Sequence, residues 1–379
     1  MQIAVLKRRI LIFTNSFRIG GSERQALELF RNMDRAKFDL RLASFSTDGP
    51  LATLLPCPMD DVQVYPLTGF YRKSCLDQAR RFYRYLTAER IEVVQCFDFY
   101  SNLFAIPVAR LAGVPIILGA RREESTLKTS LQRSIQRFCY RIGTGVVANA
   151  GSIREALIKD EHLSPDCVWA IPNGLDLKAF DVQMAQSLYP KADKGLRIAV
   201  VANLRPEKGH RVFLEAVSSL APQHPHVQFL IAGEGPLRGA IEAQIERDNL
   251  KDQVHLLGAI LDIPAFLASL DGLVLPSITE AFSNAVMEAM AASLPVVATD
   301  TGGTRDLVVD GETGFVVPPR DPRQLAARLD VLCRDAGLRR KMGEAGRWRV
   351  VRHFTTQNMS RQYEELYASL LSAQQGGRA

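Results

Sequence analysis

The sequence has few features of a secreted or membrane-spanning protein. Its six cysteines are scattered and no two form a C-x-x-C pair, which argues against a zinc site or a disulfide framework and favours a reducing compartment. No stretch of about 18 uncharged apolar residues occurs, so a transmembrane helix is not expected. The start, MQIAVLKRRILIFTN, has its basic cluster after the first apolar residues, and we interpret it as a first strand rather than a signal peptide.

The first glycine-rich loop lacks the usual nucleotide-binding motifs. The stretch RIGGSERQ, residues 18–25, is neither G-x-G-x-x-G nor a loop ending in G-K-[ST], so neither a dinucleotide fold nor a P-loop is predicted from it. Gly20 and Gly21 would still let the backbone approach a ligand, and the following helix offers free N–H groups to an anion or a sugar hydroxyl. A tight turn between strand and helix explains the glycines equally well.

Length and composition predict a two-domain globular enzyme with an uneven charge. The chain has 379 residues, 47% of them hydrophobic and 23% charged, which is ordinary for a soluble enzyme. Residues 1–190 hold 25 basic and 19 acidic side chains, whereas residues 191–379 hold 22 of each. The whole positive excess therefore lies in the first half, which suggests an anionic partner there or simply a solvated basic face.

Apolar runs alternate with helical patterns along both halves. RRILIFT and LRIAVVA each precede a glycine-containing turn and a helix, and further apolar runs follow at the spacing of βαβ units. This pattern predicts two doubly wound, Rossmann-like α/β domains with parallel sheets. We expect the first domain over 1–190, a linker near 189–194 and the second domain over 191–355. A last helix over about 356–373 follows the second domain and could pack back on the first.

Ligands of such sheets bind beyond the carboxyl ends of the strands, so the charged residues there are candidates for a site. In the loop ANLRPEKGH, Arg205 and Lys208 follow a strand, and two such cations can hold a diphosphate through charge-assisted hydrogen bonds. Taken singly, each of them is equally a solvated loop charge.

A second candidate lies in the stretch TEAFSNAVMEAMAASLPVVATDTGG, which holds two glutamates eight positions apart. Here a helix is predicted to begin at 282–284, and its first amides, those of Phe282, Ser283 and Asn284, could meet a phosphate. Glu288 lies one turn inside that helix and could chelate two vicinal hydroxyls, while Glu280 stays in the preceding loop and could address a second polyol. The alternative is that Glu280 caps the helix and Glu288 is a surface acid.

These pieces together resemble the retaining glycosyltransferases of family 4, which have the two-domain GT-B fold with the domains facing each other across a cleft. The resemblance covers nearly all of residues 10–370. It rests on IPNGLDLKAF, LRPEKGH, IAGEGPLR and the long segment from LGAILDIPAF to TGFVVPP. The two glutamates with their flanks are its specific element, whereas the glycine loop alone is weak.

The resemblance implies a role for each candidate site residue in the second half. Glu280 would contact the donor sugar, Glu288 the ribose, and the amides of Phe282, Ser283 and Asn284 the diphosphate. Lys208 is similar to the family's diphosphate-binding lysine, while Asn203 stands where an arginine is often found, so that Arg205 could serve instead. Gly258 and Ile260 fall where the family reads the edge of the base. Gly20 and Gly21 resemble its glycine loop, which faces the diphosphate and the acceptor.

The first half departs from the family where many members carry catalytic-site histidines. Arg121 stands in the place of one, and the segment VVQCFDFYSN, which includes Asp98, replaces another. Arg121 could bind the acceptor phosphate or the donor sugar, and Asp98 could orient the acceptor hydroxyl. Both could equally be structural.

The resemblance implies transfer of a hexose with retention of configuration from a UDP- or GDP-linked sugar to a hydroxyl of a glycan or lipid-linked acceptor, in polysaccharide or glycolipid synthesis. No D-x-D motif occurs in the chain, so we expect no cofactor and no obligatory metal. Nucleic acid is not an expected partner. A helix rich in arginine and apolar residues is predicted over 121–141. It could lie on anionic lipid, as in a cytoplasmic protein peripheral to the inner face of the membrane, or pack on its own sheet.

Two other functions remain compatible with the sequence. A sugar-nucleotide 2-epimerase shares the fold, and turnover of the donor without an acceptor would reveal it. A non-catalytic nucleotide-sugar-binding protein would bind the donor without transfer or slow hydrolysis.

Overall fold

The computed structural model describes residues 7–18, 20–67, 69–70, 72–123, 128–187, 189 and 195–376. The chain divides into two compact units. Unit 1 comprises Met1–Gly174 and Thr356–Ala379, and unit 2 comprises Leu175–Thr355. Each unit has its own parallel sheet, as the alternating pattern of apolar runs and helices predicts.

The described part of unit 1 contains a seven-stranded parallel sheet in the order β3-β2-β1-β4-β5-β6-β7. Its central strands are mostly apolar and buried, which is typical of parallel sheets, although β1 begins with the half-buried Arg8 and Arg9 and β4 contains the buried Gln95. The strands are β1 (Arg8–Thr14), β2 (Phe38–Ser44), β3 (Gln63–Val64), β4 (Val93–Cys96), β5 (Ile116–Arg121), β6 (Gly145–Ala148) and β7 (Val168–Ala170).

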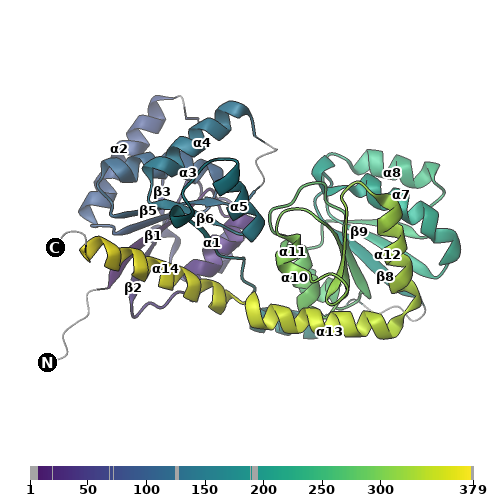
Figure 1. Cartoon of the computed structure of the whole chain (residues 1–379). Helices are drawn as coiled ribbons and strands as arrows, with labels where there is room; N and C mark the ends of the chain where they lie inside the picture. Colours follow the sequence, from purple (N-terminus) through teal and green to yellow (C-terminus); the bar gives the residue numbers. More distant parts are fainter. Residues whose placement is uncertain are drawn as a thin grey trace. The chain divides into compact units, whose positions relative to one another are not determined.

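Helices cover both faces of this sheet (Figure 1). The helix α3 contacts both α2 and α4, whereas α1 contacts the C-terminal helix α14. The right-handed crossovers of a parallel sheet place α2, α3 and α4 on one face and α1 on the other. The helices are α1 (Gly21–Asn32), α2 (Lys73–Ala88), α3 (Phe99–Leu111), α4 (Ser130–Ile142), α5 (Gly151–Lys159) and α14 (Thr356–Gly376).

The C-terminal helix is part of the core of unit 1. Met359, Tyr363, Leu366, Tyr367 and Leu371 recur at helical spacing and are buried in one cluster with residues of β1, β2 and α1. Burying each such side chain stabilises the fold by about 1.5–3 kcal/mol. The helix therefore joins unit 1 although unit 2 precedes it in the sequence.

The described part of unit 2 contains a six-stranded parallel sheet in the order β10-β9-β8-β11-β12-β13. The strands are β8 (Leu196–Val201), β9 (Val227–Ala232), β10 (Val254–Gly258), β11 (Gly272–Leu275), β12 (Val296–Thr299) and β13 (Gly314–Val317). The helices are α6 (Leu177–Ala185), α7 (His210–Leu220), α8 (Arg238–Arg247), α9 (Ile263–Leu267), α10 (Asn284–Ala291), α11 (Thr304–Leu307), α12 (Pro322–Arg334) and α13 (Ala336–His353).

The division between the units falls at Gly174/Leu175 and not at the expected 190/191. Helix α6 packs on α9, and Ser187 Oγ donates a hydrogen bond of 2.6 Å to the carbonyl of Ala265. These contacts tie the segment before residue 190 to unit 2. The expected linker near 189–194 lies outside the described residues except for Tyr189.

The chain leaves and re-enters unit 1 at neighbouring points. The backbone N–H of Leu175 donates to the carbonyl of Phe354 at 2.9 Å, and Leu175 forms a parallel bridge with Thr355.

None of the helices in the described residues combines the length and the apolar composition that a membrane-spanning helix needs.

Candidate functional site

The loops at the carboxyl edge of the unit 2 sheet contact one another through a hydrogen bond and close backbone packing. The N–H of Ile278, after β11, donates to the carbonyl of Glu207, after β8, at 2.7 Å. Gly209 has a φ of +67°, and a Cβ there would lie 1.9 Å from the carbonyl oxygen of Pro276. Only glycine fits this close approach, so the two loops hold a fixed spacing.

Lys208 and Glu280 meet at this edge. Lys208 Nζ lies 2.6 Å from Glu280 Oε2, and the two side chains keep 22% and 15% of their surface exposed. Lys208 ends a short 3-10 helix, Pro206–Lys208, and Glu280 lies in the loop after β11. The structure thus joins two predicted site residues from positions 72 apart in an ion pair that a ligand can reach.

The loop after β12 fixes the backbone of Glu280. Gly302 has a φ of +48°, and a Cβ there would lie 1.7 Å from the carbonyl oxygen of Glu280. The next residue, Gly303, donates its N–H to the carbonyl of Ala281 at 2.6 Å. These backbone contacts of Gly302 and Gly303 fix the position of the segment that leads into α10.

The predicted helix start is confirmed at α10, Asn284–Ala291. Ser283 is its N-cap, and Ser283 Oγ accepts a hydrogen bond from the N–H of Val286 at 3.3 Å. Phe282 is buried and its ring lies 5.8 Å from that of Phe354. Glu288 is only 5% exposed, so it is not the surface acid of the alternative interpretation.

Asn203 and Arg205 are exposed in the loop after β8. The N–H of Arg205 donates to the carbonyl of Asn203 at 2.9 Å. His210, which the sequence analysis did not single out, lies 3.0 Å through Nε2 from the same carbonyl. Burial lowers the pKa of His210, so the ring is neutral near pH 7 and donates from Nε2 to fix the loop.

Gly258 and Ile260 lie where β10 ends, at the same edge. Gly258 has a φ of +75°, and its carbonyl accepts a 2.7 Å hydrogen bond from the N–H of Gly233 after β9. The side chain of Glu234 lies close to Gly258. A Cβ added at Gly258 would be 2.9 Å from Glu234 Oε1. All the site residues predicted in the second half therefore lie on neighbouring loops or helix starts of one sheet edge.

Gly20 and Gly21 begin α1 at the carboxyl end of β1 in unit 1. Gly20 is the extended N-cap, and the Glu23 carboxylate lies so close that a Cβ on Gly20 would be 2.2 Å from it. Burial raises the pKa of Glu23. Gln25 exchanges two hydrogen bonds with the backbone of Gly174, at 3.0 and 2.9 Å. Neither Glu23 nor Gln25 was predicted, since acids and amides in a first helical turn are common caps.

Asp98 is the N-cap of α3. Asp98 Oδ1 accepts from the N–H of Ser101 at 2.9 Å in a reciprocal capping box. Asp98 Oδ2 is buried without a hydrogen-bond partner among the described residues. Burial raises the pKa of Asp98 to about 7, against the opposing effect of the hydrogen bonds from Ser101. A role toward an acceptor hydroxyl stays a prediction.

Arg121 ends β5, and its guanidinium is bound inside unit 1. Its Nη1 lies 3.0 Å from Glu161 Oε1 and 3.3 Å from Gln136 Oε1, and its Nε donates to the carbonyl of Glu123 at 2.7 Å. The residue is 4% exposed. The helix expected over 121–141 therefore does not begin at Arg121; α4 begins at Ser130, and residues 124–127 lie outside the described part. A role of Arg121 toward a ligand stays a prediction.

Arg122 is a further residue that sequence reasoning missed. Its guanidinium donates to Asn173 Oδ1 and lies 5.1 Å from the centroid of the Phe97 ring. Burial lowers its pKa, against the opposing influence of Tyr363 and Glu23. No sequence signal distinguishes it from Arg121, because the two arginines are adjacent at the end of the same apolar run.

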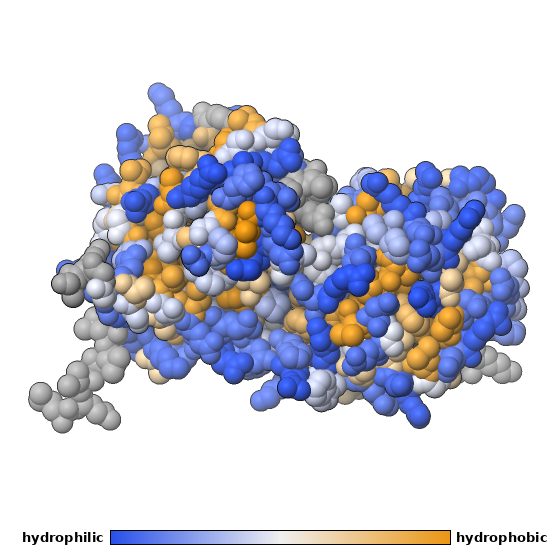
Figure 2. Space-filling model, in the orientation of Figure 1, coloured by the Kyte–Doolittle hydropathy of each residue, from blue (hydrophilic) through white to orange (hydrophobic). Residues whose placement is uncertain are grey.

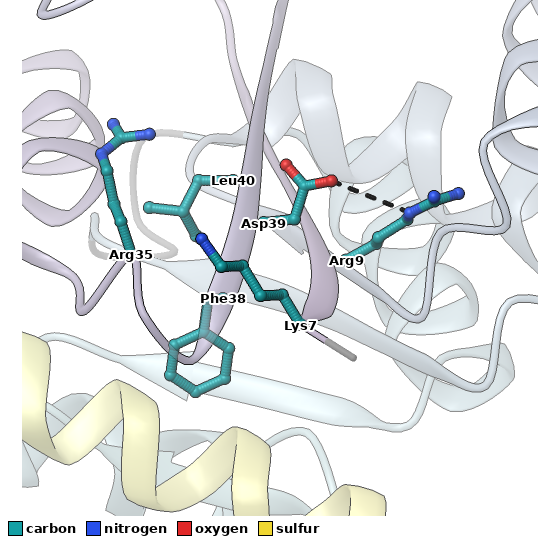
Figure 3. A pocket seen from close by; sticks show the side chains of 6 residues that line it. All are labelled: Lys7, Arg9, Arg35, Phe38, Asp39 and Leu40. Carbon is teal, nitrogen blue, oxygen red and sulfur yellow. Dashed lines mark ion pairs between the residues drawn. The ribbon is translucent and has the colours of Figure 1, made fainter. Parts of the chain in front are cut away.

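A cavity of about 440 Å³ lies at the opposite edge of the unit 1 sheet (Figure 3). Its lining comes from the residues just before and at the start of β1 and from the start of β2: Lys7, Arg9, Arg35, Phe38, Asp39 and Leu40. Arg9 Nε lies 3.7 Å from Asp39 Oδ2. Since parallel-sheet ligands bind at the carboxyl ends, this cavity is not part of the candidate site. Among the described residues no group of three potential ligands (His, Cys, Asp or Glu) could hold a metal ion.

Comparison with known proteins identifies the family. Residues 19–179 match the family model Glycosyltransferase Family 4, and residues 186–349 match Glycosyl transferases group 1. The alpha-D-kanosaminyltransferase of Streptomyces kanamyceticus is 34% identical over 313 residues, which cover 77% of this chain and 81% of that protein. The chain belongs to the family 4 glycosyltransferases. It has the GT-B fold of two parallel-sheet α/β domains.

Two further relatives of this family 4 glycosyltransferase are informative. The UDP-Gal:alpha-D-GlcNAc-diphosphoundecaprenol alpha-1,3-galactosyltransferase of Escherichia coli is 27% identical, over 80% of this chain and 82% of that protein. The crystal structure of Anabaena Alr3699/HepE in complex with UDP matches with a TM-score of 0.81, covering 95% of this chain and 100% of that one at 19% identity. At that identity the structural likeness shows the fold.

Proposed function

We propose that this glycosyltransferase moves a hexose from a nucleotide-diphosphate sugar to a hydroxyl of a glycan or lipid-linked acceptor, with retention of configuration. The observation that carries the proposal is the accessible Lys208–Glu280 ion pair immediately before the start of α10. It combines a cation for a diphosphate, a carboxylate for a sugar and a helix N-terminus for a phosphate at one sheet edge.

The donor would be held by both partners of this ion pair. The leaving diphosphate gains negative charge as the bond to the anomeric carbon breaks. Lys208, Arg205 and the amides at 282–284 would stabilise that charge without reorganising during the reaction. Lys208 would exchange the Glu280 carboxylate for the diphosphate, which leaves Glu280 free to accept hydrogen bonds from the sugar.

The nucleotide would be held deeper in unit 2. Glu288, buried one turn inside α10, would accept hydrogen bonds from the ribose hydroxyls, and Gly258 and Ile260 would meet the base. Asn203 would border the diphosphate. The E. coli relative is named for a UDP-linked galactose donor and the Anabaena structure contains UDP, which supports a UDP- or GDP-linked donor.

The acceptor would bind at the carboxyl edge of unit 1. Gly20 and Gly21 permit close approach, and Asp98 would orient the attacking hydroxyl, with Arg121 near an acceptor phosphate. The E. coli relative is named for a diphosphoundecaprenol-linked acceptor and a Staphylococcus aureus relative for capsular polysaccharide biosynthesis. These names favour a cell-surface glycan or glycolipid acceptor, reached by a cytoplasmic protein peripheral to the membrane.

Fixed cations would replace a divalent metal in this reaction. We expect transfer to continue in the presence of EDTA and to need no added cofactor. A loss of transfer that magnesium or manganese restores would contradict this part of the proposal.

Two substitutions test the assignment of the donor site. Glu280→Ala should lower turnover by about 10- to 100-fold with little change in nucleotide affinity, because charge-assisted hydrogen bonds to a donor sugar contribute about 1.5–3 kcal/mol. Glu288→Gln should chiefly weaken binding of the nucleotide. Kinetics with UDP-, GDP- and ADP-sugars, together with isothermal titration of the free nucleotides, would separate the two effects.

The same assay distinguishes the alternative functions. Release of an isomerised sugar without an acceptor would indicate a 2-epimerase. Donor binding with neither transfer nor hydrolysis would indicate a binding protein. Unchanged kinetics in both variants would exclude the proposed site.

A further inference from the structure

Four aromatic residues gather at the carboxyl edge of the unit 1 sheet, where each follows the end of a strand. They are Phe45 after β2, Phe70 after β3, and Phe99 and Tyr100 after β4. Their rings form a row in which neighbouring centroids are 6.5 Å apart for Phe45 and Phe70, 6.1 Å for Phe70 and Tyr100, and 5.4 Å for Tyr100 and Phe99. We name these four residues the aromatic platform.

The aromatic platform extends from the core of unit 1 to its surface. Phe45 is 9% exposed, Phe70 and Phe99 are half-buried, and Tyr100 is 49% exposed. The planes of the Phe70 and Tyr100 rings differ by only 21°, and offset stacking of this kind is one of the arrangements that aromatic pairs prefer. Tyr100 therefore keeps about half of its surface open although two other rings contact it.

The residues around Tyr100 fix its position. Asp98 and Ser101 form the reciprocal capping box of α3, which stabilises the helical turn that carries Tyr100. Lys128, whose side chain is 6% exposed, places its Nζ 4.1 Å from the centroid of the Phe99 ring. A ring held in this way loses little conformational freedom when a ligand covers it.

Exposed apolar side chains elsewhere on unit 1 do not have this surrounding. Figure 2 shows hydrophobic residues interleaved with hydrophilic ones where Figure 1 places α2 and α4, and scattered exposure is normal for a protein surface. Tyr83 of α2 is 42% exposed, but it lies in the second half of that helix and none of the described aromatic rings contacts it. Tyr100 differs because it lies at the sheet edge where ligands bind and because other rings support it.

A pyranose ring is the ligand whose chemistry fits this surface. One face of a pyranose presents C–H groups that an aromatic ring can cover, whereas the hydroxyls at its rim need polar partners. The half-buried Asp98 carboxyl group, two residues before Tyr100, is such a partner. A hydrocarbon chain in the same place would take this carboxyl group out of water without offering it a hydrogen bond.

We propose that Tyr100, supported by Phe70, stacks on the pyranose ring of the acceptor that carries the attacking hydroxyl. That the sugar belongs to the acceptor rests on the proposed function, in which Asp98 orients this hydroxyl. The loop after β3 brings Phe70 to Tyr100 although β2 and β1 lie between β3 and β4 in the sheet. Tyr100 thus selects for an acceptor that ends in a sugar, either a glycan or a glycosylated lipid.

Octyl β-D-glucopyranoside below its micelle-forming concentration is a direct probe, because it joins a pyranose ring to a hydrocarbon chain. In saturation-transfer NMR with irradiation of the aromatic protons of the full-length protein, the C–H protons of the sugar should receive more saturation than those of the chain. The methyl glycosides of glucose, galactose and N-acetylglucosamine extend the test to sugars without a chain. At least one of them should bind, and its titration gives a dissociation constant.

Variants of Tyr100 separate stacking from other roles. Tyr100→Ala should raise the dissociation constant of the glycoside roughly tenfold, because the apolar ring surface is lost. Tyr100→Phe keeps the ring and should stay within about twofold of the unsubstituted protein. Tyr83→Ala removes an equally exposed tyrosine of the same unit and should bind the glycoside normally. All three variants should keep the melting temperature and the affinity for UDP or GDP, measured by isothermal titration.

Five results would overturn the proposal. No binding of the glycosides, or an unchanged affinity in Tyr100→Ala, would show that the ring contacts no sugar. Stronger saturation of the octyl chain would identify a surface for hydrocarbon. A loss in Tyr100→Phe as large as in Tyr100→Ala would assign the effect to the hydroxyl. An equal loss in Glu280→Ala would place the glycoside in unit 2. Absence of UDP and GDP binding would instead contradict the proposed function, while the glycoside titrations would still decide whether Tyr100 binds a sugar.

Discussion

Two ion pairs at the ends of strands differ in their exposure. In unit 2 the Lys208 and Glu280 side chains are 22% and 15% exposed, whereas in unit 1 those of Arg121 and Glu161 are 4% and 9% exposed. An accessible pair can exchange one partner for a ligand at small cost, while a buried pair leaves an uncompensated charge when one partner is removed.

The two ion pairs differ in what surrounds them. The carboxyl edge of the unit 2 sheet is open, and a cation, a carboxylate and a helix start are held in place there by backbone contacts such as those of Gly209 and Gly302. Around Arg121, Gln136 of α4 accepts a hydrogen bond from the guanidinium and donates one to Tyr140 of the same helix, whose hydroxyl donates to the carbonyl of Ala120 in β5. This network ties α4 to β5 and holds the Arg121 guanidinium inside unit 1.

The largest expected effect is on the stability of unit 1. Arg121→Met should lower the free energy of unfolding by about 3–5 kcal/mol, because Glu161 is left as a buried charge without its partner. Urea denaturation would measure this loss, and adding Glu161→Leu should recover much of it. Arg238→Met, which breaks exposed pairs with Glu234 and Glu242, should cost less than about 1 kcal/mol.

The opposite outcome would break the comparison. If Arg121→Met kept full stability but lost sugar transfer, the guanidinium would have to turn toward a ligand during the reaction. Unit 1 would then contain an exchangeable pair like that of unit 2.

The next effect concerns catalysis by unit 2. Lys208→Gln should reduce kcat/KM by about 10²–10³-fold, which is typical for loss of one preorganised group that stabilises developing charge. Stability should change by less than about 1 kcal/mol, since the pair is partly exposed. Lys251→Gln, in the exposed pair with Glu246, is the control and should be fully active. Loss of activity by both variants to the same degree would refute a specific role.

A third prediction uses the pH dependence of Asp98. Its pKa of about 7 in the folded protein lies above its ordinary value of 3.8, so between these values the folded state binds more protons than the unfolded state. The stabilising contribution is complete below about pH 4 and is lost as the pH rises through 7. Asp98→Asn keeps a capping side chain and should remove up to about 4 kcal/mol of this pH dependence, since one pKa unit corresponds to about 1.4 kcal/mol.

The informative quantity is the difference in pH dependence of the melting temperature between the unsubstituted protein and Asp98→Asn. Melting temperatures from pH 4.5 to pH 8 should fall more steeply for the unsubstituted protein than for Asp98→Asn. Parallel curves would mean that solvent reaches the Asp98 carboxylate, and that the unit 1 edge is as open as that of unit 2.

Much of unit 2 could be predicted because its signals are local. The strands are short apolar runs, and the helix start at Ser283 follows from a serine before an apolar helical pattern. The positions of Glu280 and Glu288 relative to that start need only the chain between them. The pairing of Lys208 with Glu280 was also within reach, because loops after neighbouring parallel strands meet at one edge.

The rest depends on contacts between distant residues. Arg121 pairs with Glu161, forty positions later, and no pattern of spacing indicates on which side of β5 its side chain lies. The division at Gly174/Leu175 was missed because α6 is held to unit 2 by α9, some 80 residues farther on. The raised pKa of Asp98 arises from burial, which a capping residue in a sequence does not reveal.

The smallest expected effect is at the start of α10. Ser283→Ala removes the hydrogen bond from the N–H of Val286 and should lower stability by about 1 kcal/mol. If this helix start holds the donor phosphate through backbone amides, the substitution loosens the helix start but keeps those amides, so KM for the donor should rise only a few-fold with kcat nearly unchanged. Ser130→Ala, beside the Thr129 cap of α4, is a matched control that should alter neither quantity. A large fall in kcat for Ser283→Ala would instead show that the hydroxyl itself contacts the reacting groups.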